Sequence, residues 1–153
     1  MDQNKLRSYF YLPDTCMSEA HQYSQELCMR LGVYCSRAVD IVHELAANRV
    51  TPGAEVFLQT GFGQLPPLEA IPDGVPKRQH HIWLEPSSLE RLERSAKTRK
   101  ISVNKRLASC LQLSNELIRM GANPLKVVHN GGVLKINPRP NEPSRVSYSL
   151  RRA

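Results

Sequence analysis

Long apolar runs are missing from this chain of 153 residues. No stretch approaches the roughly 18 uninterrupted apolar residues that suggest a membrane-spanning helix. The first residues, MDQNKLRSYFYL, also lack the apolar core and cleavage site of a signal peptide. We therefore expect a cytoplasmic protein that does not associate with a membrane.

The motifs of common catalytic and metal sites are also missing. The sequence contains no Gly-rich phosphate loop, no HExxH and no GxSxG. His80 and His81 are neighbours, but adjacent residues of a strand face opposite sides and cannot bind one ion together. We expect no catalytic site, no metal and no cofactor.

Cysteine is scarce and shows no metal-binding or redox spacing. The chain has four cysteines and no CxxC pair: Cys16, Cys28, Cys35 and Cys110. Most of them lie on the faces of predicted helices. This pattern favours buried, reduced thiols over the alternative of a disulfide or a redox role.

Positive charge is scarce in the first half of the chain and concentrated in the second. The net charge is +7, yet residues 51–76 hold three acidic residues and no Lys or Arg. Residues 77–121 hold ten basic residues against four acidic ones, and residues 122–153 hold six against one. Such a balance favours an anionic partner, of which nucleic acid is the commonest, over a merely solvated basic surface.

Residues 78–121 predict a strand followed by two helices. β-branched and aromatic residues gather in the run 80–84, which is typical of a strand. The sequence SSLE at 87–90 is typical of a capping box at the start of a helix. Ser102 is a suitable N-cap for a second helix, and Gly121 offers a left-handed stop at its end.

The first half of the chain repeats this order. Residues 6–12 alternate as a strand does, and a helix follows from Asp14 or Thr15 until Gly32 breaks it. A second helix is predicted from about Ser36 to Asn48. Aligning the halves with Gly32 on Lys100 requires about five extra residues in the first. The alternative is that two helical hairpins merely look alike.

The order of strand, helix and helix, with Ser102-Val103-Asn104 opening the last helix, resembles the ribbon-helix-helix family of DNA-binding proteins. The resemblance implies an α+β fold that is mainly α, with a short two-stranded antiparallel ribbon. Two copies, residues 6–49 and 78–121, would form the family's pseudo-dimer within one chain and pack as one domain. Covalent linkage would favour their pairing.

The remaining segments predict a connector and a basic extension. Residues 50–77 are rich in Pro and Gly, although 55–58 could dock on the core as a short element. In the extension, 122–153, residues 125–136 predict two strands around an Asn-Gly turn. Beyond Pro138 we expect disorder, with a tail that either follows DNA phosphates or only aids solubility.

The resemblance also implies which residues contact DNA bases. The paired strands would lie in the major groove with every second side chain towards the base edges. With Leu12 and Leu84 inward, the expected base contacts are Arg7, Tyr9, Tyr11, Gln79, His81 and Trp83. Arg7 suits guanine and Gln79 suits adenine. A slip of one residue would reverse the whole set, and a core position for Trp83 stays open.

The start of the second helix in each copy is the expected phosphate site, because free N–H groups and the helix dipole favour an anion there. The residues assigned to these sites are Cys35, Ser36 and Arg37 in the first copy, and Lys100, Ser102, Val103, Asn104 and Lys105 in the second. Tyr34 stands where the aligned counterpart of Ser102 would be, so the first site should bind less well. The alternative is a capped helix with a solvated basic face.

By this resemblance, the chain is expected to be a monomer that binds double-stranded DNA with sequence preference. Tandem versions of the fold look most like accessory proteins that help a relaxase in conjugative or T-DNA transfer, and transcriptional repressors use the same scaffold. Several copies on one duplex are compatible with this interpretation. The alternative from a different class is an antitoxin-like adaptor that binds a partner protein through its tail.

Overall fold

The computed structural model describes residues 8–58, 60–68, 74–129, 132–136 and 146–150. Four helices and two antiparallel sheets make up this part of the chain, so the predicted α+β class is confirmed. In chain order the elements are β1 (Tyr9–Pro13), α1 (Asp14–Glu26), α2 (Leu31–Ala47), β2 (Glu55–Leu58), β3 (Gly61–Gln64), β4 (Lys77–His81), α3 (Pro86–Arg99), α4 (Val103–Arg119), β5 (Ala122–His129), β6 (Gly132–Ile136) and β7 (Val146–Leu150).

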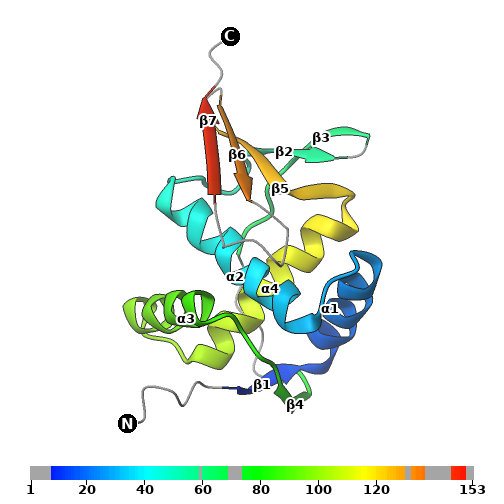
Figure 1. Ribbon diagram of the computed structural model, residues 1–153, viewed down its shortest axis with the longest axis vertical. Coiled ribbons are helices and arrows are strands. Elements are labelled where there is room, and N and C mark those ends of the chain that lie inside the picture. The colour runs from blue at the N-terminus through cyan, green and yellow to red at the C-terminus, as the bar shows by residue number, and fades with distance from the viewer. Residues whose placement is uncertain (1–7, 59, 69–73, 130–131, 137–145, 151–153) are drawn as a thin grey trace.

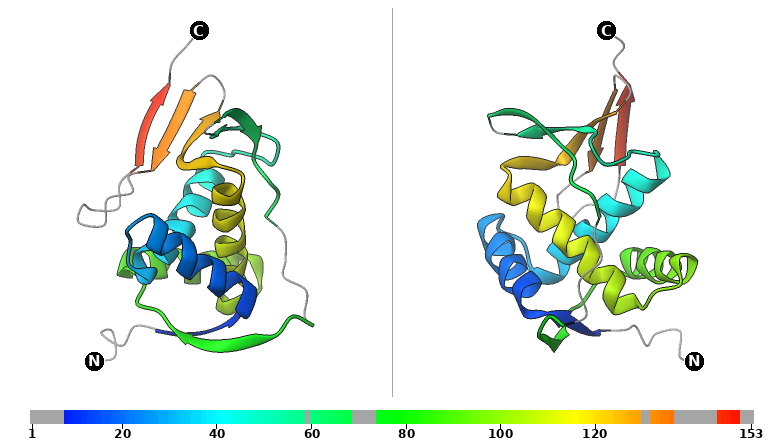
Figure 2. Two further views of the ribbon diagram at one scale, coloured as in Figure 1. Left: turned by 90° about the vertical axis from the view of Figure 1, so that its right-hand side faces the viewer. Right: turned by 180° about the vertical axis from the view of Figure 1, so that it is seen from behind.

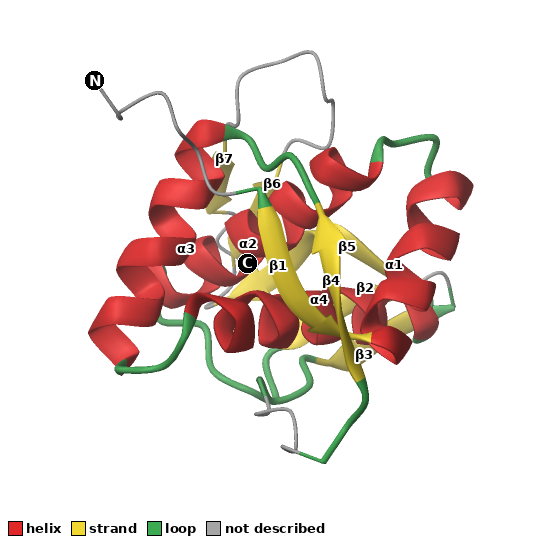
Figure 3. Ribbon diagram, turned by 90° about the horizontal axis from the view of Figure 1, so that it is seen from below, coloured by secondary structure: helices red, strands yellow, loops and turns green. Residues whose placement is uncertain are grey.

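The two sheets lie at opposite ends of the helices (Figures 1 and 2). At one end β1 pairs with β4, and we call this two-stranded sheet the ribbon. At the other end five strands follow the order β3-β2-β5-β6-β7. Seen from below, the ribbon crosses in front of the helices (Figure 3). It therefore presents one face outward and packs the other on the helices.

The ribbon joins segments that are far apart in the sequence. Tyr9 lies opposite His81 and Pro13 lies opposite Lys77. The N–H of Ile82 also donates to the carbonyl of Ser8, at 2.8 Å. The expected pairing of these segments is therefore confirmed. The second strand begins at Lys77 rather than near His80, because the ladder uses backbone groups and accepts the polar residues that precede the apolar run.

The two strand-helix-helix units repeat at a constant separation of 72 residues. The first helices begin at 14 and 86, and the second helices begin at 31 and 103. Left-handed residues recur at the same separation: Cys28 and Lys100 between the helices, and Arg49 and Gly121 after them. We call residues 9–49 the first repeat and residues 81–121 the second. No extra residues are needed to align them, so the predicted insertion of about five is wrong.

The start predicted for the second helix of the first repeat is also wrong. Helix α2 begins at Leu31 rather than near Ser36, and Gly32 lies in its first turn instead of breaking the preceding helix. The alignment of Gly32 with Lys100 was therefore displaced by four residues. Four residues are about one helical turn, so the displaced alignment kept the apolar residues on the same face.

The predicted start and end signals of α4 are confirmed, whereas the predicted capping box of α3 is wrong. Ser102 caps α4, where its side chain accepts from the N–H of Lys105, and Gly121 has the left-handed φ of 81° expected of a helix stop. The capping box at 87–90 is wrong. Helix α3 begins at Pro86 without a side-chain cap, and Ser88 points inward to Asp40. Proline suits the first turn because it needs no N–H partner there.

Both repeats contribute to one apolar core. The fully buried side chains beneath the ribbon include Phe10, Leu12 and Ile82, and they meet Leu92 and Leu111 from α3 and α4. Burying a side chain of this size contributes roughly 1.5–3 kcal/mol. Neither repeat could bury these residues alone, which explains why two units in one chain pack as a single body.

The five-stranded sheet is built from segments whose strands the sequence patterns predict only in part. Residues 55–58 do form an element, β2, and its Val56 is 1% exposed. The predicted hairpin of 125–136 is confirmed as β5 and β6, with its Asn-Gly turn outside the described residues. Beyond Pro138, residues 146–150 form β7 against β6, so the expected disorder is wrong for that segment. The rest of the tail lies outside the described residues.

Within the described residues, no helix has the length and apolar character to cross a membrane. The four cysteines are free thiols in the structure. Three of them are buried, and burial raises the pKa of Cys16 to about 11 and of Cys35 and Cys110 to about 12. Cys28 differs from the expectation, because it is exposed at the end of α1.

Candidate nucleic-acid interface

The outward face of the ribbon carries exposed aromatic and polar side chains. Tyr9 is 55% exposed, Tyr11 54% and Trp83 64%. Phe10 and Ile82, at the intervening positions of the strands, are each 1% exposed. Gln79 and His81 are exposed as well. The alternation expected for a ribbon covered on one side is therefore present. The open question about Trp83 is answered in favour of the outward position. Arg7, the sixth expected base contact, lies outside the described residues.

The aromatic rings on this face touch one another. Tyr9 stacks on His81 with ring centroids 4.7 Å apart, and His81 meets Trp83 edge-on at 4.8 Å. Tyr9 and His81 occupy equivalent positions in the two repeats and also face each other across the ribbon. The end of the ribbon where Tyr9 faces His81, with Trp83 two residues beyond, therefore holds a line of three rings. Contacts between rings restrict their rotation, which reduces the entropy cost of binding.

His80 supports the same strand register from the inner side. It is half-buried, and its Nε2 is buried without a hydrogen bond to any residue in the described ranges. Burial lowers the pKa of His80 below its ordinary value, an effect that the nearby Asp14 carboxylate partly offsets. The imidazole is therefore neutral at pH 7 and can face the core side of the ribbon.

The start of α4 gathers the five residues expected there. Lys100, Ser102 and Lys105 are exposed, and Val103 and Asn104 are half-buried. The side-chain Oδ1 of Asn104 accepts from the N–H of Tyr11 in the ribbon, at 3.1 Å. This contact fixes the helix start beside the outward-facing strand. Two lysines and the exposed end of the helix dipole therefore lie at the ribbon edge, where they can attract an anion.

The three residues expected to bind phosphate in the first repeat do not lie at a helix start. Cys35 and Ser36 are 0% exposed and Arg37 is 3% exposed, all within the second turn of α2. Their assignment as phosphate contacts rested on the wrong start for this helix. In these positions their side chains cannot reach a phosphate without unfolding the helix, and we no longer count them in the site.

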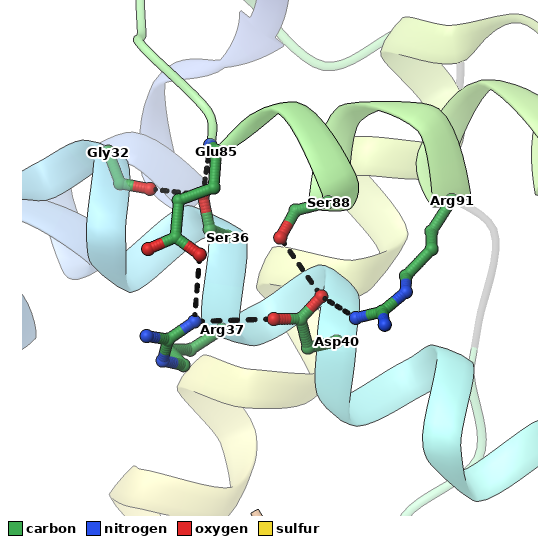
Figure 4. A network of polar contacts seen from close by, with 7 residues as sticks. All are labelled: Gly32, Ser36, Arg37, Asp40, Glu85, Ser88 and Arg91. Carbon is green, nitrogen blue, oxygen red and sulfur yellow. Dashed lines mark hydrogen bonds and ion pairs between the residues drawn. The ribbon is translucent and has the colours of Figure 1, made fainter. Parts of the chain in front are cut away.

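Buried polar contacts account for these residues instead (Figure 4). Ser36 donates to the carbonyl of Gly32, and its oxygen accepts from the N–H of Glu85 at 2.9 Å. The Nη1 of Arg37 lies 3.3 Å from Asp40 and 3.1 Å from Glu85. Asp40 also accepts from Ser88 and Arg91. The charge of Arg37 is thus compensated inside the fold.

The actual start of α2 approaches the chain just after β4 through Gly32. A Cβ at this position would clash with the carbonyl oxygen of Trp83, so only glycine lets the helix backbone come this close. Gly32 occupies the position equivalent to Asn104, and Trp83 the position equivalent to Tyr11. The residue at the N-cap is Arg30, which is exposed. Gly32 is the sequence signal for this close approach, although a glycine in that context predicts a helix break.

Comparisons with protein-family models, with curated proteins and with solved structures found no match to this chain.

Proposed function

We propose that the chain binds double-stranded DNA by inserting the ribbon into the major groove, as a single-chain ribbon-helix-helix pseudo-dimer. The observation that carries this proposal is the outward face of the ribbon. Five side chains with hydrogen-bonding atoms stand exposed on it, while Phe10, Leu12 and Ile82 at alternate positions are buried in the core. A cluster of exposed aromatic residues of this kind is typical of a binding surface. A two-stranded ribbon also has the width that a major groove admits.

Each outward side chain offers chemistry that a base edge can use. Gln79 can donate and accept at once, which suits the N6 and N7 edge of adenine. The rings of Tyr9, Tyr11 and Trp83 can contact thymine methyl groups while their O–H or N–H groups bind acceptors. We therefore assign sequence preference to these ribbon residues.

Phosphate binding is assigned mainly to the start of α4. Lys100 and Lys105 supply charge, and the first N–H groups of the helix point in the same direction as its positive dipole end. In the first repeat, Arg30 is the exposed cation nearest the start of α2. We therefore expect the two phosphate contacts to be unequal, with the second repeat contributing more.

This function is compatible with both roles that the family resemblance implies. An accessory protein of conjugative or T-DNA transfer and a transcriptional repressor each need a unit that selects a duplex sequence. The net charge of +7 supports an electrostatic contribution in either role.

The test is selection of bound duplexes from a random pool, followed by titration of single variants. Gln79→Ala should lower affinity for the selected duplex by roughly 1–3 kcal/mol and relax the preference at one position. Lys105→Ala should weaken binding to all duplexes alike. It should also reduce the slope of the logarithm of the binding constant against the logarithm of the salt concentration by about one. Arg119→Ala, at the far end of α4, is the matched control and should change neither property.

Two results would contradict the proposal. One is a pool without an enriched sequence, together with weak, non-specific binding, which is what a protein-binding adaptor predicts. The other is unchanged affinity for the selected duplex in Gln79→Ala and Lys105→Ala alike. In that case the ribbon and the start of α4 would not be the interface.

A further inference from the structure

A basic cleft lies between α2, α3 and the first turn of α4. Its volume is about 470 Å³, within the range of small-molecule sites. Four arginines line it: Arg91, Arg94 and Arg99 from α3, and Arg106 from α4, with His43 of α2 opposite. Neither the outward ribbon residues nor Lys100 and Lys105 at the start of α4 line the cleft, so the proposed DNA contacts do not account for it.

Two of the four arginines have a carboxylate partner among the described residues. Arg91 pairs with Asp40 at 2.8 Å, and Arg94 pairs with Glu90 on the same helix. Among the residues that the structure describes, Arg99 and Arg106 form no ion pair. Arg99 and Arg106 therefore bring positive charge to the cleft that no described carboxylate pairs with.

Arg106 is the unusual member of this group because it is buried. The residue is 4% exposed, and its Nε is buried without a hydrogen bond to any part of the described chain. Burial lowers the pKa of Arg106, and repulsion from Arg99 acts in the same direction. A guanidinium does not give up its proton in a protein, so its burial is costly unless an anion compensates it. The cleft beside Arg106 has room for such an anion.

A smaller, mainly apolar pocket adjoins the basic cleft. Its volume is about 170 Å³, and it shares Ala46, Arg99 and Arg106 with the cleft. The rest of its lining is largely aliphatic, including Leu45 of α2 and Leu65 after β3. Arg106 thus stands between a cationic space and an apolar one. A ligand that fits both needs an anionic head and a short apolar group.

We propose that this cleft binds a small phosphate monoester, with the phosphate between Arg99 and Arg106 and an apolar substituent in the adjoining pocket. A phosphate monoester carries a charge of about −1.5 to −2 at pH 7, which matches the two uncompensated arginines. The planar guanidinium fork also suits phosphate oxygens geometrically. This site is distinct from the proposed DNA interface and does not depend on it.

Calorimetric titration with phenyl phosphate tests the proposal on the full chain. Wild type should bind phenyl phosphate, inorganic phosphate should bind more weakly, and phenol should not bind. Arg106→Met should reduce the affinity for phenyl phosphate at least about tenfold while leaving the melting temperature unchanged or higher, because it removes a buried charge. Arg99→Gln alters only an exposed side chain and should also weaken binding. Arg119→Met, on the same helix as Arg106, is the control that should bind as wild type does.

The proposal is overturned if wild type does not bind phenyl phosphate, or if Arg106→Met and Arg99→Gln both bind it as tightly as wild type does. A DNA phosphate in the cleft is the competing explanation. It predicts that saturating duplex displaces phenyl phosphate and that Arg106→Met weakens binding of duplex and phenyl phosphate by the same factor. That result would also overturn the proposal, whereas retained phenyl phosphate binding in a chain that binds no duplex would support it and reject only the DNA function.

Discussion

The two repeats share a backbone plan but stabilise it with different chemistry. Both place left-handed residues at equivalent positions and both bring the start of their second helix against the ribbon. In the first repeat that contact depends on the absence of a side chain at Gly32, whereas in the second it depends on the amide of Asn104. The second arrangement leaves an exposed, capped and lysine-rich helix start. This difference explains why we assign phosphate binding mainly to the second repeat.

The buried polar groups follow the same division. Ser36 accepts from the N–H of Glu85 in one half of the molecule. At the equivalent positions stand Ala108 and Pro13, and proline has no N–H to satisfy. The Ser36 hydroxyl is therefore present opposite the N–H of Glu85, and no hydroxyl stands at Ala108, where Pro13 has no N–H. Buried polar groups require partners, so paired substitutions of this kind keep both halves satisfied.

Removing Asp40 should produce the largest difference between the repeats. The carboxylate is 2% exposed and receives contacts from Arg37, Ser88 and Arg91. Asp40→Ala therefore takes this acceptor from the buried Ser88 and from Arg91, and it takes one of two carboxylates from the buried Arg37, which keeps Glu85. We expect a loss of roughly 3–5 kcal/mol in the free energy of unfolding. Gln112 is the equivalent residue of the second repeat, and the loss for Gln112→Ala should stay below about 1 kcal/mol. Urea unfolding followed by circular dichroism measures both.

One result would contradict the expected difference in stability between Asp40→Ala and Gln112→Ala. Equal losses for Asp40→Ala and Gln112→Ala would mean that the ion network around Arg37 adds no stability beyond ordinary packing. Unchanged m-values are needed for the comparison, because a change in m would indicate a different unfolded state.

A smaller effect is expected where the two helices meet the ribbon. Gly32→Ala places a methyl group against the carbonyl of Trp83 and should cost about 1–3 kcal/mol, the usual range for overpacking. Asn104→Ala removes one hydrogen bond to Tyr11 and should cost about 0.5–1.5 kcal/mol. At most helix positions the change from Gly to Ala is stabilising. A higher melting temperature for Gly32→Ala would therefore reject the close approach of α2 to the ribbon.

Local patterns predicted much of the fold because they depend on nearby residues. The alternation of Phe10 and Leu12 with Tyr9 and Tyr11 determines which ribbon face is buried. From this alternation, the side of the ribbon was predicted correctly for each expected base contact that the structure describes. The cap at Ser102 and the hairpin after Gly121 were predicted for the same reason. Each of these features is determined within a few residues of sequence.

The errors have a different physical origin. A helical face is nearly unchanged by a shift of four residues, so periodicity alone could not distinguish a helix start at Leu31 from one near Ser36. The capping box failed because Ser88 finds a partner 48 residues away in the sequence, in Asp40. The pairing of β2 with β5 is likewise a contact between distant segments. The charge cluster around Arg106 belongs to this class too, since α2, α3 and α4 all line the cleft.

The residue that follows the second helix offers the smallest and most symmetric comparison of the repeats. Arg49 has a φ of 57° and Gly121 a φ of 81°, so both stand in the left-handed region. Arg49→Gly relieves about 1–2 kcal/mol of backbone strain but gives the unfolded chain more freedom, worth about 0.4–1 kcal/mol, so a net gain of roughly 0.8 kcal/mol is expected. Gly121→Ala should lose about 1 kcal/mol for the opposite reason. Thermal unfolding of the two variants measures both, and changes of the same sign would show that the helix ends are not equivalent.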